Sequence, residues 1–357
     1  MNCRRPGLEE SIRSALSNKC WTGSALRTAI REGKHLLLTC RTMFQFIVKA
    51  FASCVISVSN AMLSLPYIGR FLDVLLALGC STVRIGAGGF VASGLESCKR
   101  PKKLLQLYEY EGCPFCRRVR ETLTILDLDA EIFPTPRETF KEYGYSNESR
   151  FRPAVLKHGG KCQFPFLIDP NNNIKMYESS EIVKYLWATY GDKAFPSLFD
   201  RLANLPGLNA GLFLAGAFRM LPHHGLLRTP SACPAKKLEL YSSENSPFCR
   251  IAREALTTLE LPYVLKNCAH GAERNRMEFQ SKFSSHLSNS RRTIGKLLGK
   301  TIVKIPFLVD PNTGVTMSES ADIVKYLNDT YKTGKTVNET LVNYTTKGAT
   351  EGHMKVL

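Results

Sequence analysis

Residues 105–128, LQLYEYEGCPFCRRVRETLTILDL, place two cysteines where an alternating segment gives way to a helical pattern. Apolar and polar residues alternate through LLQLYEY, which is typical of a half-buried strand. After a turn at residues 111–112, apolar positions recur at helical spacing from Val119 onward. Cys113 therefore lies just before the predicted helix, and Cys116 follows three residues later.

The same pattern occurs twice in the chain. The first stretch matches LELYSSENSPFCRIAREALTTLEL at residues 238–261, at an offset of 133 positions. Further on, FPFLIDPNNNIKMYESSEIVKYL at residues 164–186 matches IPFLVDPNTGVTMSESADIVKYL at residues 305–327, at an offset of 141. The difference of 141 − 133 = 8 residues is expected in a surface connection near a basic segment. The sequence therefore predicts a duplicated structural unit.

The repeat divides the 357-residue chain into six parts. They are a transit or disordered region (1–48), an apolar helical segment (49–101), unit one (102–191), an apolar helical linker (192–235), unit two (236–333) and a disordered tail (334–357). With 44% hydrophobic and 22% charged residues, the chain has enough apolar material for sizeable cores.

The order of elements within a unit is βαβ, then a hairpin, then a helix. FPFLID reads as a strand entered through a proline, PNNN as a turn, IKMYE as a second strand and SSEIVKYLWATY as an amphipathic helix. This order resembles the thioredoxin fold in its glutaredoxin and glutathione-transferase N-terminal form. The residues that carry the resemblance are CPFCR at 113–117, Pro165, and the pair Glu178 and Ser179.

The duplicated arrangement looks like the tandem glutathione-transferase N-terminal-domain proteins of plants and algae. The resemblance implies an α/β protein with two tandem thioredoxin-like domains, each preceded by an apolar helical segment. A glutathione transferase normally adds an all-helical C-terminal domain that supplies the pocket for the electrophile. Residues 192–235 and 334–357 are too few for that domain. Its predicted absence shifts the expectation from conjugation toward thiol–disulfide exchange.

The two cysteines of unit one fit a redox pair. A helix N-terminus stabilises a thiolate, so Cys113 is the predicted nucleophile, with Pro114 suited to the first turn and Arg117 adding positive charge. Cys116 is placed to resolve a mixed disulfide by attacking the sulfur of Cys113. Inert packing and a metal site remain alternatives, but a zinc site needs two further ligands, and Cys162 is the only other cysteine nearby in the sequence. We predict no metal.

The resemblance also implies a glutathione site in unit one. It implies that the peptide bond before Pro165 is cis, which would let the edge of the site pair with an extended peptide. It places the γ-glutamyl end of glutathione at Glu178 and Ser179, where a helix begins. We expect Lys161 and Arg117 to meet the glycyl carboxylate.

Unit two keeps the binding features and lacks the first cysteine. Ser246 stands in the position of Cys113, while Cys249, Pro306 and the pair Glu319–Ser320 are retained. A serine hydroxyl cannot form a disulfide, although it can donate a hydrogen bond to a glutathione thiolate. Unit two is therefore predicted either to bind glutathione without redox turnover or to serve as a structural partner.

Positive charge is concentrated in two regions of a chain whose net charge is +17. Residues 1–100 contain thirteen Lys and Arg against five Asp and Glu, and residues 282–304 contain six basic residues and no acid. Such runs suit solvated loops or anionic partners. We find no nucleic-acid-binding module and expect no nucleic-acid partner.

Residues 50–69 are uncharged and long enough to cross a bilayer, but their serines, asparagine and proline favour an interfacial or packed helix. Residues 1–48, with eight basic and three acidic residues, resemble an organellar transit peptide. We expect a plastid location, with the cytoplasm or an organelle membrane surface as the alternatives.

Two classes of function follow from these features. The first is a glutathione-dependent thiol–disulfide oxidoreductase, glutaredoxin-like, with glutathione as cofactor and protein or small-molecule disulfides as partners. The second is a non-catalytic glutathione-binding protein or a scaffold at a membrane surface. A glutathione-transferase-like activity is a further alternative.

Overall fold

The structure is a computed structural model, and its described residues all belong to the unit Ser59–Leu357. The described residues are 66–137, 149–205, 210–217, 219, 225–287, 302–333 and 354–356. The predicted transit region, most of the apolar stretch 50–69, much of the basic segment and most of the tail lie outside them. No helix in these ranges is long and apolar enough to cross a membrane.

Repeat one contains the elements predicted for unit one. Its elements are β1 (Leu105–Glu109), α4 (Pro114–Ile125), β2 (Ala130–Pro134), α5 (Arg152–Gly159), β3 (Phe166–Asp169), β4 (Ile174–Met176) and α6 (Ser179–Tyr190). Strands β1 and β2 are parallel, and β3 pairs antiparallel with both β1 and β4. This is the thioredoxin-like arrangement that the sequence predicted.

Repeat two follows the same order. Its elements are β5 (Leu238–Ser242), α9 (Pro247–Thr258), β6 (Tyr263–Asn267), α10 (Glu273–Phe283), β7 (Phe307–Asp310), β8 (Val315–Ser318) and α12 (Ser320–Tyr331). A short turn of 3-10 helix, η2 (Ser284–His286), follows α10, and the strand β9 (Met354–Val356) pairs with β8.

Helices outside the repeats precede each of them. Helix α3 (Pro66–Thr82) and the 3-10 turn η1 (Leu95–Ser97) precede repeat one, and α7 (Leu198–Ala203) and α8 (Ala210–Ala217) precede repeat two. Helix α3 packs against α9 of repeat two, whereas α8 packs against α4 of repeat one. The Sγ of Cys80 in α3 lies 3.0 Å from the carbonyl oxygen of Ala215 in α8, so the two helices also meet.

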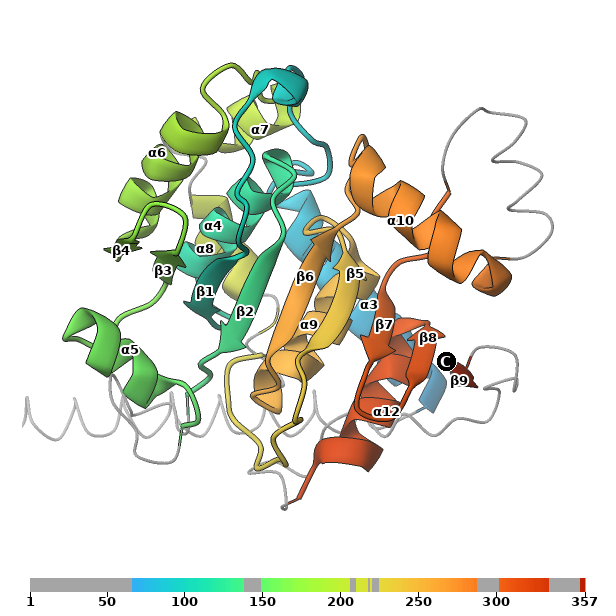
Figure 1. The fold of residues 1–357 in the computed structure, drawn as a ribbon. Helices are drawn as coiled ribbons and strands as arrows, with labels where there is room; N and C mark the ends of the chain where they lie inside the picture. The colour runs from blue at the N-terminus through green and yellow to red at the C-terminus, as the bar shows by residue number, and fades with distance from the viewer. Residues whose placement is uncertain are drawn as a thin grey trace, which may run out of the picture. The chain divides into compact units, whose positions relative to one another are not determined.

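The two repeats share one sheet. In the described chain its strand order is β4-β3-β1-β2-β6-β5-β7-β8-β9, and Figure 1 shows β2 and β6 side by side at the join. These two strands are antiparallel, with Ala130 opposite Leu265 and Ile132 opposite Tyr263. One hydrophobic cluster then runs through both repeats, from Leu107 and Val119 to Leu240 and Leu256. The sequence predicted the two units but not this join.

Behind the join lies a buried cluster of charged side chains, here called the interface charge cluster. Its members pair across the repeats as well as within them, as in the bond from Arg120 to Glu244. The cluster consists of Arg84, Arg117, Arg120, Arg219, Arg250, Arg253, Asp73, Glu109, Glu111, Glu121, Glu244 and Glu254. Each member lies within 4.0 Å of an opposite charge, as the burial of charged groups requires.

Candidate active site

Cys113 occupies the N-cap position of α4. Its backbone is extended, with φ −87° and ψ 121°, and Pro114 opens the helix. The backbone N–H of Cys116 donates to the Cys113 sulfur over 3.3 Å. A thiolate at this position receives both a hydrogen bond and the partial positive charge of the helix N-terminus.

The two thiols of repeat one differ in acidity. Burial raises the pKa of Cys113, but hydrogen bonds from the side chain and backbone of Cys116 outweigh it, so the pKa of Cys113 is lowered. Burial and the adjacent Cys113 raise the pKa of the Cys116 thiol well above its usual value. In repeat one, Cys113 is therefore the thiol that ionises first, and thiolate character governs thiol reactivity.

A pocket of about 610 Å³ opens above Cys113. Among the residues predicted from sequence, Cys113, Lys161, Pro165, Glu178 and Ser179 line it. They come from the start of α4, the segment before β3 and the start of α6, which the fold brings together. Cys116 is fully buried within a small apolar cluster with Tyr110 and Cys113.

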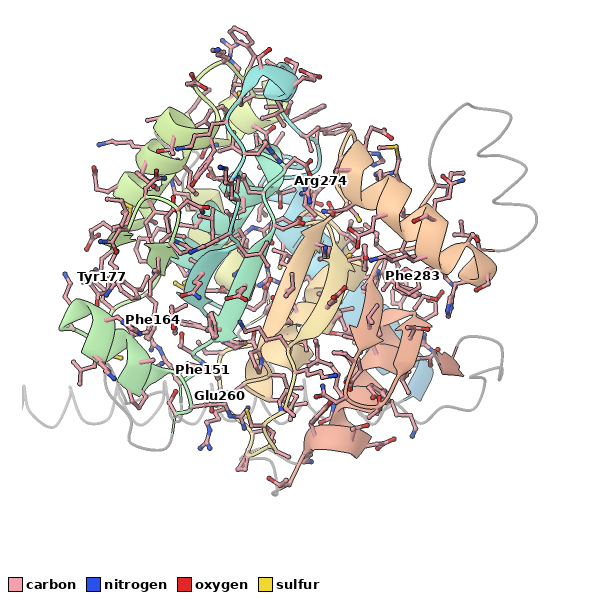
Figure 2. All side chains as sticks on the ribbon, in the orientation of Figure 1. Phe151, Phe164, Tyr177, Glu260, Arg274 and Phe283 are labelled. Atoms are coloured by element: carbon pink, nitrogen blue, oxygen red, sulfur yellow. The ribbon has the colours of Figure 1, made fainter. Side chains whose placement is uncertain are left out.

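The peptide bond between Phe164 and Pro165 is cis, as the family resemblance implied, and so is the bond between Ile305 and Pro306. Phe164 and Tyr177 lie beside α5 (Figure 2). Lys161 lines the pocket, and its ammonium lies 4.8 Å from the centre of the Tyr177 ring, in a cation–π contact.

Glu178 and Glu319 share an unusual backbone conformation just before α6 and α12. Their φ and ψ angles are 65° and 109° for Glu178, and 80° and 119° for Glu319. Such a conformation costs a non-glycine residue about 1–3 kcal/mol and is found mainly at functional sites. The side-chain partners differ, because Gln163 donates to Glu178 whereas Lys304 pairs with Glu319 over 2.9 Å. Both repeats thus keep the backbone conformation at this glutamate, but its side chain pairs with a neutral amide in repeat one and with a cation in repeat two.

Repeat two has a pocket of about 500 Å³ above Ser246. Ser246 repeats the geometry of Cys113, because its Oγ accepts from the N–H of Cys249 over 3.3 Å. Burial raises the pKa of Cys249, so its thiol is a poor nucleophile at neutral pH. This pocket is lined by residues such as His270, Arg276 and Ile305, whereas the predicted Pro306, Glu319 and Ser320 are outside its lining.

Two family models match the chain, and both describe the N-terminal domain of glutathione S-transferases. One match covers residues 107–194 and the other residues 245–330. The chain carries two tandem glutathione S-transferase N-terminal domains. No curated protein and no solved structure matched the chain. Because the matches cover N-terminal domains, which in general bind glutathione, the protein is a glutathione-related protein of thioredoxin fold.

The predicted role of Arg117 in the first glutathione S-transferase N-terminal domain is wrong. Its side chain is 2% exposed and belongs to the interface charge cluster, where its Nε lies 3.0 Å from Glu121 and 3.9 Å from Glu244. It does not line the pocket, and the main causes of the lowered pKa of Cys113 are the hydrogen bonds from Cys116 rather than this cation. The i,i+4 spacing of Arg117 and Glu121 was a readable signal for this pair.

The first domain also places cations in the pocket that sequence reasoning missed. Arg137 and Arg152 both line it, and Arg137 donates to the hydroxyl of Tyr110 over 3.3 Å. The Arg152 guanidinium lies 4.9 Å from the ring centre of Phe164. These arginines follow β2 in a region without repeat identity, so comparing the two repeats could not single them out.

The second domain has a structural counterpart of Arg152. Arg152 donates to the carbonyl oxygens of Thr135 and Pro136, and Arg276 donates to those of Cys268 and Ala269. The two carbonyl pairs correspond at an offset of 133, whereas the arginines are 276 − 152 = 124 positions apart. Each domain thus supplies its pocket with a guanidinium from the helix after its second strand. An alignment without gaps cannot detect this equivalence.

The described residues contain no group of three or more His, Cys, Asp or Glu side chains placed to hold a metal ion.

Proposed function

We propose that the protein is a glutathione-dependent thiol–disulfide oxidoreductase whose working site is the pocket of the first domain. The observation that carries this proposal is the position of Cys113. It is an acidified thiol at a helix N-cap, it lines a pocket, and it shares that pocket with Pro165 and the start of α6.

The reaction begins with the Cys113 thiolate. It attacks the glutathione sulfur of a glutathionylated protein, the bond between the two substrate sulfurs breaks, and the protein substrate leaves as a thiolate. Cys113 is then joined to glutathione. A second glutathione thiolate attacks the glutathione sulfur of this adduct, so that oxidised glutathione leaves and Cys113 is regenerated. Alternatively, Cys116 attacks Cys113 and releases reduced glutathione.

Charge in the pocket supports an anionic tripeptide as ligand. Lys161, Arg137 and Arg152 line the wall, and a carboxylate docks favourably at the N-terminus of α6 near Ser179. Glutathione carries two carboxylates, so one can meet the helix N-terminus and the other the pocket cations. In this proposal, Lys161 keeps the role predicted for the glycyl carboxylate, with Arg152 in place of Arg117.

The second domain has a separate proposed role. Ser246 occupies the nucleophile position and accepts the same backbone hydrogen bond, so this domain can hold a thiol compound without forming a disulfide. Non-covalent binding of glutathione or a similar anion near Arg276 is the function that its pocket supports.

The test is a glutathione-coupled disulfide reduction assay on the full chain. Cys113→Ser is expected to reduce the rate to that of the uncatalysed reaction. Cys249→Ser is the matched control, because Cys249 is a buried cysteine of the second domain at the position equivalent to Cys116, and it is expected to retain the wild-type rate. A Cys113→Ser protein as active as wild type would overturn the proposal.

A further inference from the structure

Helices α3 and α8 expose a group of large apolar side chains. These side chains, here called the helical face, are between 47% and 67% exposed and are Phe71, Leu75, Leu78, Phe213 and Leu214. On α3 they recur at intervals of four and three residues, so they form one stripe along the helix. Clusters of exposed apolar side chains mark surfaces that bind another protein or a membrane.

The repeat relates the two halves of the helical face. The arginines that follow α3 and α8, Arg84 and Arg219, pair with equivalent glutamates of α4 and α9. These arginines are 219 − 84 = 135 positions apart. At this offset Leu78 corresponds to Phe213, so the same position of each helix carries an exposed apolar side chain.

Both helices present the helical face on the same side of the sheet. Because β2 and β6 are antiparallel neighbours in one sheet, a half-turn about an axis normal to that sheet relates the two repeats. Figure 1 shows α3 and α8 behind the sheet, where they pack against α9 and α4. The helices meet at equivalent positions, since the Cys80 sulfur donates to the carbonyl oxygen of Ala215 at the same offset of 135. The face is therefore continuous across the contact between the two helices.

Charge is nearly absent from this face. Helix α8 has no charged residue, and α3 has only Arg70 and Asp73. Asp73 is buried and pairs with Arg219 over 2.6 Å, whereas Arg70 is exposed. The two helices thus offer solvent a set of apolar side chains and one cation, and neither helix exposes an acid.

The sequence that leads into α3 indicates which partner suits the face. Residues 50–69 carry no charge and run directly into α3, and residues 1–100 hold a net charge of 13 − 5 = +8. A second copy of the chain would cover the apolar stripe but would meet the same excess of positive charge. An anionic bilayer suits all of these features, because its acyl region accepts apolar side chains and its headgroups attract cations.

We propose that the helical face binds the surface of an anionic lipid bilayer. The five side chains enter the boundary between headgroups and acyl chains, and Arg70 contacts the headgroups. With 17 and 8 residues, α3 and α8 are shorter than the roughly 20 residues that a helix needs to cross a bilayer. They therefore rest on the membrane surface and do not span it.

This attachment brings the first pocket close to the lipid. Phe115 lines that pocket and meets Phe213 of the helical face edge to face, with 5.6 Å between the ring centres. The thiol chemistry proposed for Cys113 then acts on disulfides at the membrane surface. Membrane binding does not depend on that chemistry, so a Cys113→Ser protein should bind vesicles as wild type does.

The experiment is co-flotation of the full chain with phosphatidylcholine vesicles that contain or lack phosphatidylglycerol. Wild type is expected to float with the anionic vesicles and to bind the neutral ones more weakly. The triple variant Leu75→Ser, Leu78→Ser, Phe213→Ser should bind about 100-fold more weakly, because it removes apolar side chains without changing the charge. The control is the double variant Leu156→Ser, Met277→Ser, which removes exposed apolar side chains of α5 and α10 and should bind as wild type does.

A gain of signal tests the same face. Leu78→Trp adds an indole to a chain that has only two tryptophans, Trp21 and Trp187. Brominated phosphatidylcholine in the anionic vesicles should quench the added fluorescence. The indole of Met277→Trp, outside the face, should stay unquenched in protein that floats equally well.

Three results would overturn the inference. The first is wild-type protein that does not float with anionic vesicles. The second is a triple variant that keeps the wild-type circular dichroism spectrum and floats as well as wild type, or an indole at position 78 that stays unquenched in floating protein. The third is self-association of wild type in solution, abolished by the triple change and without flotation, which would assign the face to a second copy of the chain.

Discussion

Arg120 of the first domain donates to Glu244 of the second, with 3.0 Å between Nε and Oε2. The reciprocal bond joins Arg253 to Glu111, also with 3.0 Å between Nε and Oε2. Both partners in one bond are the repeat equivalents of the partners in the other, at the offset of 133. The two domains therefore use the same surface against each other, as subunits of a symmetric dimer do.

Removing one cation from this pairing should strongly destabilise the protein. Arg253→Met leaves Glu111 and Glu244 buried with one fewer positive charge, and the expected loss is about 3–5 kcal/mol of unfolding free energy. Urea unfolding of the full chain provides the measurement. Lys184→Met is the control, because the pair of Lys184 and Glu181 is exposed and should contribute less than about 1 kcal/mol. Equal losses in the two variants would show that the cluster does not hold the domains together.

The same cluster predicts weakness in acid. Burial raises the pKa of Glu111, but Arg120 and Arg253 outweigh it and lower the pKa from 4.5 to about 2. Because the folded-state pKa lies below the unfolded value, Glu111 contributes stability that is present above pH 4.5 and is lost as the pH falls toward 2. The melting temperature should therefore fall over this window. A Glu111→Gln variant should lose less on acidification, and an equal slope in both proteins would contradict the assignment.

Cys113 should be the first cysteine of its pair to react with an alkylating reagent. Its pKa is lowered whereas the pKa values of Cys116 and Cys249 are raised, so at mildly acidic pH the thiolate fraction is largest at Cys113. Peptide mapping after brief treatment with iodoacetamide gives the labelling rate at each site. Similar rates at the three cysteines would be evidence against the acidified thiol.

A cysteine placed in the second domain should become reactive there. Ser246 and Cys113 accept the same backbone hydrogen bond, so Ser246→Cys puts a thiol in the same geometry. In a Cys113→Ser background, this variant should regain labelling at mildly acidic pH. Labelling at position 246 that is no faster than at the buried Cys249 would contradict the shared geometry.

Much of the fold could be predicted because the repeat displays each local signal twice. Strand alternation, the proline before each inner strand and the serine at the start of α6 and α12 are short-range patterns, and they gave the order of elements. The join between β2 and β6 is a contact between strands that are far apart in the sequence. The residues of each strand do not indicate which other strand pairs with its free edge.

The site was only partly predictable, because short-range motifs identify some of its residues and contacts between distant parts of the chain position the others. Cys113, Pro165 and Glu178 belong to motifs, and the fold brings them to one pocket. Arg117 donates to Glu121 of its own helix, and its Nε also lies 3.9 Å from Glu244 of the other domain, so its burial depends in part on how the domains dock. Arg152 and Arg276 are equivalent through the carbonyl groups that they hold, which only the folded backbone displays.

The central claim is that Cys113 forms the covalent link with glutathione. The most direct measurement uses a full-length Cys116→Ser protein, which lacks the resolving thiol, incubated with oxidised glutathione and analysed by intact mass and peptide mapping. The account predicts one glutathione per chain, attached to Cys113, and no such adduct when Cys113→Ser is added. Glutathione spread over the other cysteines, or attached equally well without Cys113, would contradict it.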